Sequence, residues 1–111
     1  GGVDIRPFPD SWEMKRQLGE EKEFPERWRD HTVIEQVDSL KNGDLALIFD
    51  CGYEDFFYEV NLNLHKKLLD LGIGHDFQVR PGAHNAAYWA ISLPSQMLFF
   101  YRYFDPRALK K

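Results

Sequence analysis

The chain has 111 residues and a formal net charge of -4, and 43% of its residues are hydrophobic. These values are typical of one small globular domain. Acidic and basic residues are interspersed without a basic stripe, which argues against a nucleic-acid partner. The sequence has neither the ~18-residue apolar run of a membrane span nor a signal-peptide pattern. We therefore expect a soluble chain with no membrane partner. The sequence does not specify its compartment, although it favours the cytoplasm.

Two helices are expected in the first part of the chain, after an irregular entry loop. Residues 10–19 predict a helix that has Asp10 as its N-cap and ends at Gly19. Pro25 suits the first position of a second helix. The spacing of apolar residues within 32–41 extends this second helix.

The rest of the chain alternates strands with helices. The apolar run at 45–49, LALIF, lies between turn signals and predicts a strand buried on both faces. Residues 57–71 carry apolar side chains at helical spacing, and Gly72 ends that helix. Residues 75–79, HDFQV, predict the second strand. In the last helix, which Pro94 should kink or restart, one stripe holds Trp89, Leu93, Met97, Phe100 and Phe104.

This order of elements predicts an α/β fold with two parallel strands and about four flanking helices. Because parallel sheets usually have several strands, we expect the chain to form one side of a larger doubly wound sheet. Its hydrophobic edge at 45–49 would then be open to pairing. We expect either self-association, most simply a two-fold dimer with antiparallel pairing at this edge, or a bound N-terminal part.

Two titratable residues follow the predicted strands. Asp55 comes after the first strand and His84 after the second. Ligands of open α/β sheets bind outside these strand ends, and an acid there can orient a histidine base. Asp50 and Glu54 compete with Asp55 for the role of acid, and Asp50 could instead tie the loop backbone. Asp55 could also serve as the N-cap of the following helix.

The remaining reactive side chains have plainer interpretations. Cys51 is the single cysteine, so no internal disulfide is possible, and we expect it to be a small buried apolar side chain. The other histidines, His31, His65 and His75, lack the spacing of metal ligands, so no metal or cofactor site is expected. His65 is expected to be solvated. Tyr88, Trp89 and the Phe-rich tail are expected to lie in the core.

The segments DCGYEDFF and RPGAHNAAYW carry a pattern of the form D-C/Q-G-x-x-D-x-F, helix, P-G-G-H-x-W-x-Y-W. The matching positions are Asp50, Gly52, Asp55, Phe57, Pro81, Gly82, His84, Tyr88 and Trp89. With these motifs, residues 45–89 resemble the C-terminal part of the esterase D-like group of α/β-hydrolases. That group includes tributyrin esterases, S-formylglutathione hydrolases and feruloyl or acetyl-xylan esterases. The opening GGVDIRPFP is also similar to the group, so the resemblance covers essentially the whole chain.

The resemblance implies that residues 1–111 are the C-terminal segment of an α/β-hydrolase catalytic domain. It implies Asp55 as the triad acid, His84 as the base, an ester substrate, and no metal or organic cofactor. Ala83 and Ala86 depart from the pattern, where the group usually has Gly and often has Trp.

The nucleophile motif G-x-S-x-G of this group is absent; the serines are Ser11, Ser39, Ser92 and Ser95. The sequence thus predicts a fragment of a serine carboxylic-ester hydrolase, inactive alone, with its nucleophile in a missing N-terminal part. A stand-alone non-catalytic binding or assembly module is one alternative, and a Cys–His hydrolase built on Cys51 is another. The ester specificity is not encoded in these residues.

Overall fold

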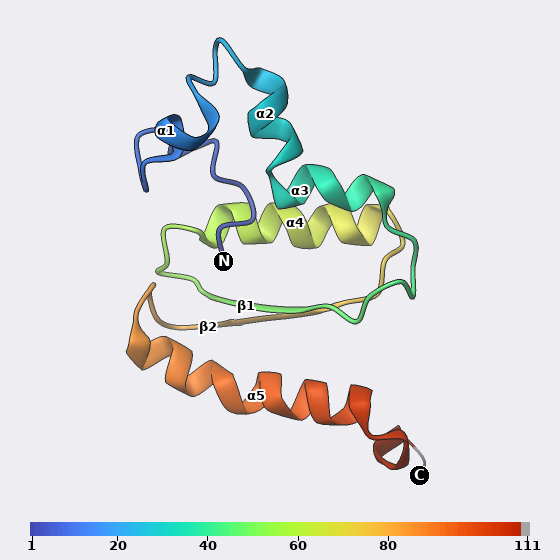
Figure 1. The fold of residues 1–111 in the computed structure, drawn as a ribbon. Helices are drawn as coiled ribbons and strands as arrows, with labels where there is room; N and C mark the ends of the chain where they lie inside the picture. The colour runs from blue at the N-terminus through green and yellow to red at the C-terminus, as the bar shows by residue number, and fades with distance from the viewer. Residues whose placement is uncertain (110–111) are drawn as a thin grey trace.

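The computed structural model describes residues 1–109 and has a two-stranded parallel sheet between helices (Figure 1). Strand β1 is Ile48–Gly52 and strand β2 is Asp76–Arg80, with Phe49 opposite Phe77. Helix α4, Tyr58–Asp70, covers one face of the sheet, and helix α5, Ala86–Phe104, covers the other. The shorter helices are α1 (Met14–Leu18), α2 (Pro25–Asp30), α3 (Val33–Gln36) and the 3-10 helices η1 (Val37–Ser39) and η2 (Pro106–Leu109). The predicted α/β class with two parallel strands is confirmed.

The first predicted helix is shorter than expected, because α1 begins only at Met14. Trp12 and Glu13 each have a φ of 55°, in the left-handed region, which interrupts any helix starting at Asp10. Asp10 therefore does not cap α1, and the prediction of an N-cap there is wrong. The predicted end is confirmed, since Gly19 follows the helix with a φ of 75°.

The second predicted helix is divided in two. Pro25 lies at its first position as expected, but α2 ends at Asp30 and α3 starts at Val33. Thr32, between the two helices, is extended and buried, and its hydroxyl donates a hydrogen bond to the carbonyl of Trp28. This side-chain bond to the last turn replaces a continuing backbone helix.

Both strands begin later than the sequence predicts, β1 by three residues and β2 by one. Leu45 is 54% exposed and lies outside β1, while Ile48 and Phe49 are only half-buried. The buried part of the strand is its far end, at Cys51 and Gly52. The prediction that residues 45–49 form a strand buried on both faces is therefore wrong in this chain.

The apolar core lies under α4. Its buried members are Val37, Leu64, Leu68 and Ile73, against which Phe49 packs. The spacing of 57–71 correctly predicts this helix and its buried face, apart from Leu71, which is exposed. The packing of α4 on the sheet positions the loop that precedes it, residues 53–57.

Helix α5 turns its polar side to the sheet and its apolar side outward. It continues through Pro94 as one helix, so no restart occurs there. Tyr88 and Ser92 are buried, whereas the exposed fractions in the predicted stripe run from 44% at Phe100 to 75% at Phe104. The expectation that Trp89 and the Phe-rich tail lie in the core is wrong, while that for Tyr88 is confirmed.

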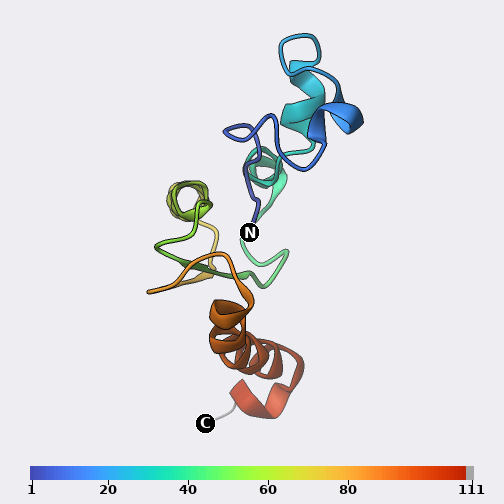
Figure 2. The same ribbon diagram turned by 90° about the vertical axis from the view of Figure 1, so that its left-hand side faces the viewer.

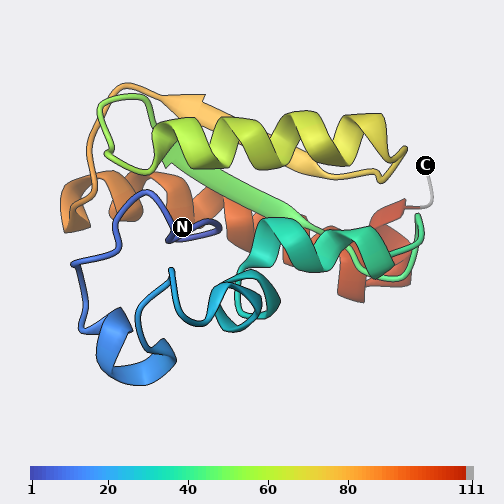
Figure 3. The same ribbon diagram turned by 90° about the horizontal axis from the view of Figure 1, so that it is seen from above.

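One edge of the sheet is open beside β1. Figures 2 and 3 show α3 next to α4, on the side of β1 away from β2. An apolar groove of about 420 Å³ lies there; its lining includes Val37, Leu40, Leu45, Leu47, Ile48 and Phe49. Within residues 1–109, no helix has the length and apolar character needed to cross a membrane.

Candidate functional site

The loops that follow the two strands cross in close contact. The backbone N–H of Glu54 donates to the carbonyl oxygen of Gly82 at 2.9 Å, and that of Tyr53 donates to the carbonyl oxygen of Arg80 at 3.0 Å. A Cβ atom at Gly52 would lie 2.1 Å from the Gly82 oxygen. Only a glycine at position 52 permits this approach of the two backbones.

Gly82 is also required by conformation and by packing. Its φ is 137°, a value that other residues rarely adopt, and an added Cβ would lie 2.4 Å from the ring of Tyr88. The next residues reach helix α5, where the side chain of Asn85 accepts a hydrogen bond from the Tyr88 N–H at 3.0 Å. This N-cap starts α5 directly after the loop and so fixes the position of His84.

The crossing brings Asp55 and His84 together. The Nδ1 atom of His84 lies 2.9 Å from Oδ2 of Asp55, and the exposed fractions of the two side chains are 33% and 5%. The other carboxylate oxygen of Asp55 accepts a hydrogen bond from the Phe57 N–H at 2.8 Å. Asp55 therefore contacts the histidine and holds the turn that precedes α4, but it is not the N-cap of that helix, because the N-cap position is Phe57.

Aromatic rings surround the imidazole of His84. The ring centroids of Phe56, Phe57 and Trp89 lie 4.9, 5.4 and 5.1 Å from that of His84. Trp12 stacks on both phenylalanines, at 6.2 Å from Phe56 and 5.3 Å from Phe57. Sequence reasoning missed Trp12, because its contact spans more than 40 positions and no local spacing indicates it. The exposure of Trp12, Phe56 and Trp89 gives the site apolar walls.

Asp50, the rival candidate for the acid, is turned away from His84 and into the contact with α5. Its carboxylate binds Arg80 at 2.5 Å and accepts a hydrogen bond from the Tyr88 hydroxyl. Burial, followed by the hydrogen bond to Asp50, raises the pKa of Tyr88 to about 12. The suggested bond from Asp50 to the loop backbone is not formed. Glu54, the other rival, is exposed.

Cys51 lies on β1 with its side chain in the interior. It is 2% exposed, and burial followed by the charge of Asp55 raises the pKa of its thiol to about 11. A thiol with so high a pKa has little of the thiolate form that attacks substrates. The geometry confirms a buried apolar side chain and gives no support to a Cys–His pair.

Two other histidines meet, contrary to the sequence interpretation. His65 and His75 are half-buried and their ring nitrogens lie 2.8 Å apart, so the expectation of a solvated His65 is wrong. His31 is exposed and contacts the carbonyl of Arg27. Within residues 1–109, no group of three or more His, Cys, Asp or Glu side chains could hold a metal ion.

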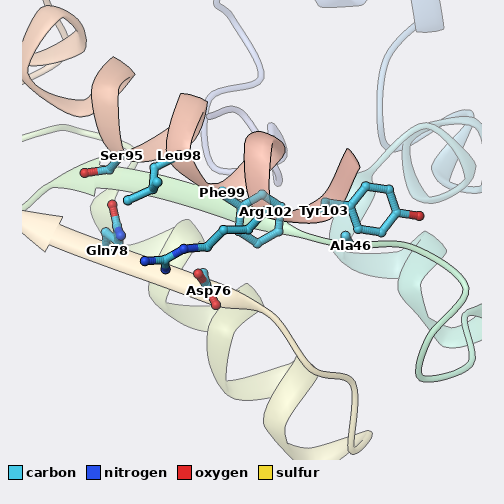
Figure 4. Close-up of a pocket in the computed structure, with 8 residues that line it drawn as sticks. All are labelled: Ala46, Asp76, Gln78, Ser95, Leu98, Phe99, Arg102 and Tyr103. Atoms are coloured by element: carbon cyan, nitrogen blue, oxygen red, sulfur yellow. The ribbon is translucent and has the colours of Figure 1, made fainter. Parts of the chain in front are cut away.

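A separate cavity of about 350 Å³ lies between β2 and the C-terminal half of α5 (Figure 4). The side chain of Arg102 extends from α5 toward Asp76 and Gln78 of β2. Asp76 begins β2, whereas His84 follows its end, so the cavity lies at the opposite end of the sheet from the site. It does not adjoin the Asp55–His84 pair.

The site thus holds an oriented imidazole without a serine beside it. The Ser92 hydroxyl donates to the carbonyl of Trp89, and the Ser95 hydroxyl accepts from Arg80. Among residues 1–109, no serine hydroxyl is hydrogen-bonded to His84, and His84 Nε2 has no hydrogen-bond partner. A histidine held through Nδ1 by a buried carboxylate can accept a proton at Nε2 and return it.

The chain matches no protein-family model and none of the curated proteins with which it was compared.

Proposed function

We propose that the chain supplies the acid and the base of a serine carboxylic-ester hydrolase, with Asp55 as the acid and His84 as the base. The observation that supports this function is the 2.9 Å contact between His84 Nδ1 and the buried Asp55 carboxylate. The contact orients the imidazole and stabilises its charged form. The serine nucleophile comes from another segment, since none of the four serines lies in a G-x-S-x-G turn.

In this mechanism, His84 Nδ1–H donates to Asp55 and leaves the Nε2 lone pair to accept the serine proton. The serine oxygen then attacks the ester carbonyl carbon, and His84 returns the proton to the departing alkoxide, which leaves as the alcohol. Water repeats the sequence on the acyl-enzyme and releases the acid. The exposed rings of Phe56, Trp12 and Trp89 supply apolar surface for the ester near the base.

The open edge of β1 is the place that we propose for the segment with the nucleophile. The carbonyl of Leu47 and the N–H of Tyr53 form hydrogen bonds with the two ends of β2. Because backbone groups alternate in direction along a strand, every second residue of β1 points its N–H and C=O groups away from β2. Ile48 and Asp50 therefore present N–H and C=O groups to a further parallel strand. The apolar groove of about 420 Å³ under α3 adjoins this edge and would cover one face of the added strand.

A non-catalytic assembly module is a second candidate, and the outward apolar stripe of α5 favours it. Five large apolar side chains at helical spacing lie exposed on that helix: Trp89, Leu93, Met97, Phe100 and Phe104. A stripe of this size is a usual mark of an interaction surface. This role requires no chemistry at His84, so the substitutions below separate the two candidates.

The experiment combines a serine-reactive fluorophosphonate with p-nitrophenyl butyrate hydrolysis. The purified chain alone should hydrolyse the ester no faster than background, because removing the nucleophile of a triad costs on the order of 10⁶ in rate. Proteins that copurify with the chain should include one with a fluorophosphonate-reactive serine, and the complex should hydrolyse the ester.

Variants of the complex then test the assignment. His84→Ala should abolish hydrolysis, and Asp55→Asn should lower kcat by about 10⁴, the loss expected when the histidine takes the wrong tautomer. His31→Ala serves as the matched control, because His31 is exposed and should leave the rate unchanged. Hydrolysis that survives His84→Ala, or a bound partner without a reactive serine, would favour the assembly module instead.

A further inference from the structure

The His65–His75 pair joins helix α4 to the residue that precedes β2. Nδ1 of His65 and Nε2 of His75 lie 2.8 Å apart. The His75 ring stacks on Phe49 at 5.6 Å, and the His65 ring packs against Phe77 at 4.8 Å, so strand side chains support both rings. The pair does not contact Asp55 or His84, the two residues on which the proposed function depends.

The backbone determines which nitrogen of His75 is free. Its Nδ1 lies 2.8 Å from the carbonyl oxygen of Ile73, and a carbonyl can only accept a hydrogen bond. Nδ1 therefore carries the proton, and in the neutral ring Nε2 has a lone pair directed at His65. A backbone carbonyl in this position is the usual partner that orients a metal-ligating histidine.

We propose that His65 and His75 form a two-imidazole site for a divalent transition metal such as Ni²⁺ or Cu²⁺. Two bonds of about 2.0 Å at a right angle place the nitrogens about 2.8 Å apart, whereas tetrahedral angles place them about 3.3 Å apart. The observed 2.8 Å fits the first geometry, which Ni²⁺ and Cu²⁺ prefer. Rotation of the half-buried His65 ring directs both lone pairs at one ion, and water fills the other positions.

Without a metal, a proton occupies the space between the rings. One N–H···N bond can form when His65 donates to His75, but two fully protonated rings would place two hydrogens in the same gap. A proton and a metal ion therefore compete for the same nitrogen lone pairs in this gap. Two charged residues adjoin the pair in the chain, Lys66 after His65 and Asp76 after His75, and both are exposed.

Calorimetric titration of the full chain with Ni²⁺ at neutral pH tests the site. Wild type should bind one Ni²⁺ per chain, and His65→Ala and His75→Ala should each weaken binding at least tenfold. His31→Ala, which removes an exposed histidine outside the pair, should bind Ni²⁺ as wild type does.

Two further measurements keep the test decisive if an alanine variant is destabilised. Ni²⁺ should raise the Tm of wild type and of His31→Ala but not that of His65→Phe, which retains an aromatic ring against Phe77. Paramagnetic broadening by Ni²⁺ should begin at the imidazole signals of His65 and His75. Unchanged affinity in both pair variants, or broadening that begins at His31 or His84, would overturn the proposal.

Discussion

Asp50 and Asp55 are the same chemical group five positions apart, and their surroundings give them different roles. The Asp55 carboxylate divides its oxygens between the start of α4 and His84. That of Asp50 is enclosed by Arg80 and Tyr88, at 1% exposure. Sequence position after the strand favours Asp55, but residue type alone could not separate the two.

Asp50→Asn is expected to lower the free energy of unfolding by about 2–3 kcal/mol, because Arg80 and Tyr88 lose a buried charged acceptor. Urea unfolding followed by circular dichroism measures the change. Asp76→Asn is the matched control on β2; that side chain is exposed, and the change should stay within about 0.5 kcal/mol. Equal losses in the two variants would contradict the structural role of Asp50.

Cys51 should react slowly with iodoacetamide at pH 8 in the native chain. Its pKa is raised from 9.0 to about 11, so the reactive thiolate is scarce, and the side chain is 2% exposed. We expect alkylation at least about 100-fold slower than in the urea-unfolded chain at the same pH. Mass spectrometry over time measures both rates, and fast native alkylation would revive the Cys–His alternative.

Because the pKa of Cys51 is raised in the folded chain, the free energy of unfolding varies with pH in the alkaline range. The folded chain binds the thiol proton more tightly than the unfolded chain, so between pH 9.0 and about 11 only the unfolded chain ionises at Cys51. The stability that this difference represents is complete below pH 9.0 and is lost as pH rises. The free energy of unfolding of Cys51→Ala, measured by urea unfolding, should therefore decline less than that of wild type as pH rises over this interval.

At the level of elements, the strand–loop crossing depends on two glycines. Gly52→Ala should destabilise the chain by about 3 kcal/mol or more and should separate Asp55 from His84, because its Cβ would meet the Gly82 carbonyl. Gly74→Ala is the control, since its Cβ would meet only the Asn42 side chain, at 3.4 Å. Unfolding curves and the His84 side-chain NMR signals report the two effects. A native His84 signal in Gly52→Ala would contradict the requirement.

The elements that sequence patterns predicted well are those whose own spacing determines them. Helix α4 has a full apolar stripe and a terminal glycine, and its bounds follow from both. The predicted bounds of the first two helices were wrong, because side-chain contacts compete with the helical backbone. These contacts are distant in sequence at Trp12 and local at Thr32. For α5, periodicity identified the stripe but not the side that faces the sheet, since the sheet face opposite α5 is polar, with Asp50, Gln78 and Arg80.

The site was predicted as two residues at two strand ends, and the structure brings these two together. The rule that parallel strands end at the same edge was enough to predict their proximity. The aromatic walls were not predictable, because Trp12 reaches the site through a left-handed turn. The His65–His75 contact was missed for a similar reason, since it depends on how α4 lies across β2 rather than on spacing along one element.

At the scale of the whole molecule, the chain leaves both an open strand edge and an apolar helix stripe exposed. We expect the isolated chain to self-associate, so light scattering should give a mass that rises with concentration. Leu45→Lys should weaken association, because Leu45 lines the groove beside β1. Leu69→Lys, at an exposed position on α4, should not. A stable monomer at high concentration would contradict this expectation.

The crossing of the two loops also constrains how the gene can vary in length. The carbonyl of Gly82 touches the backbone at Gly52, so neither loop can take up an extra residue without displacing its partner. One inserted residue shifts the following chain by up to about 3.3 Å, more than the whole contact between His84 and Asp55. Residues 41–46 have no such constraint and are exposed. Insertions and deletions in related genes should therefore accumulate before β1, whereas codons 52–57 and 80–85 should keep a fixed number.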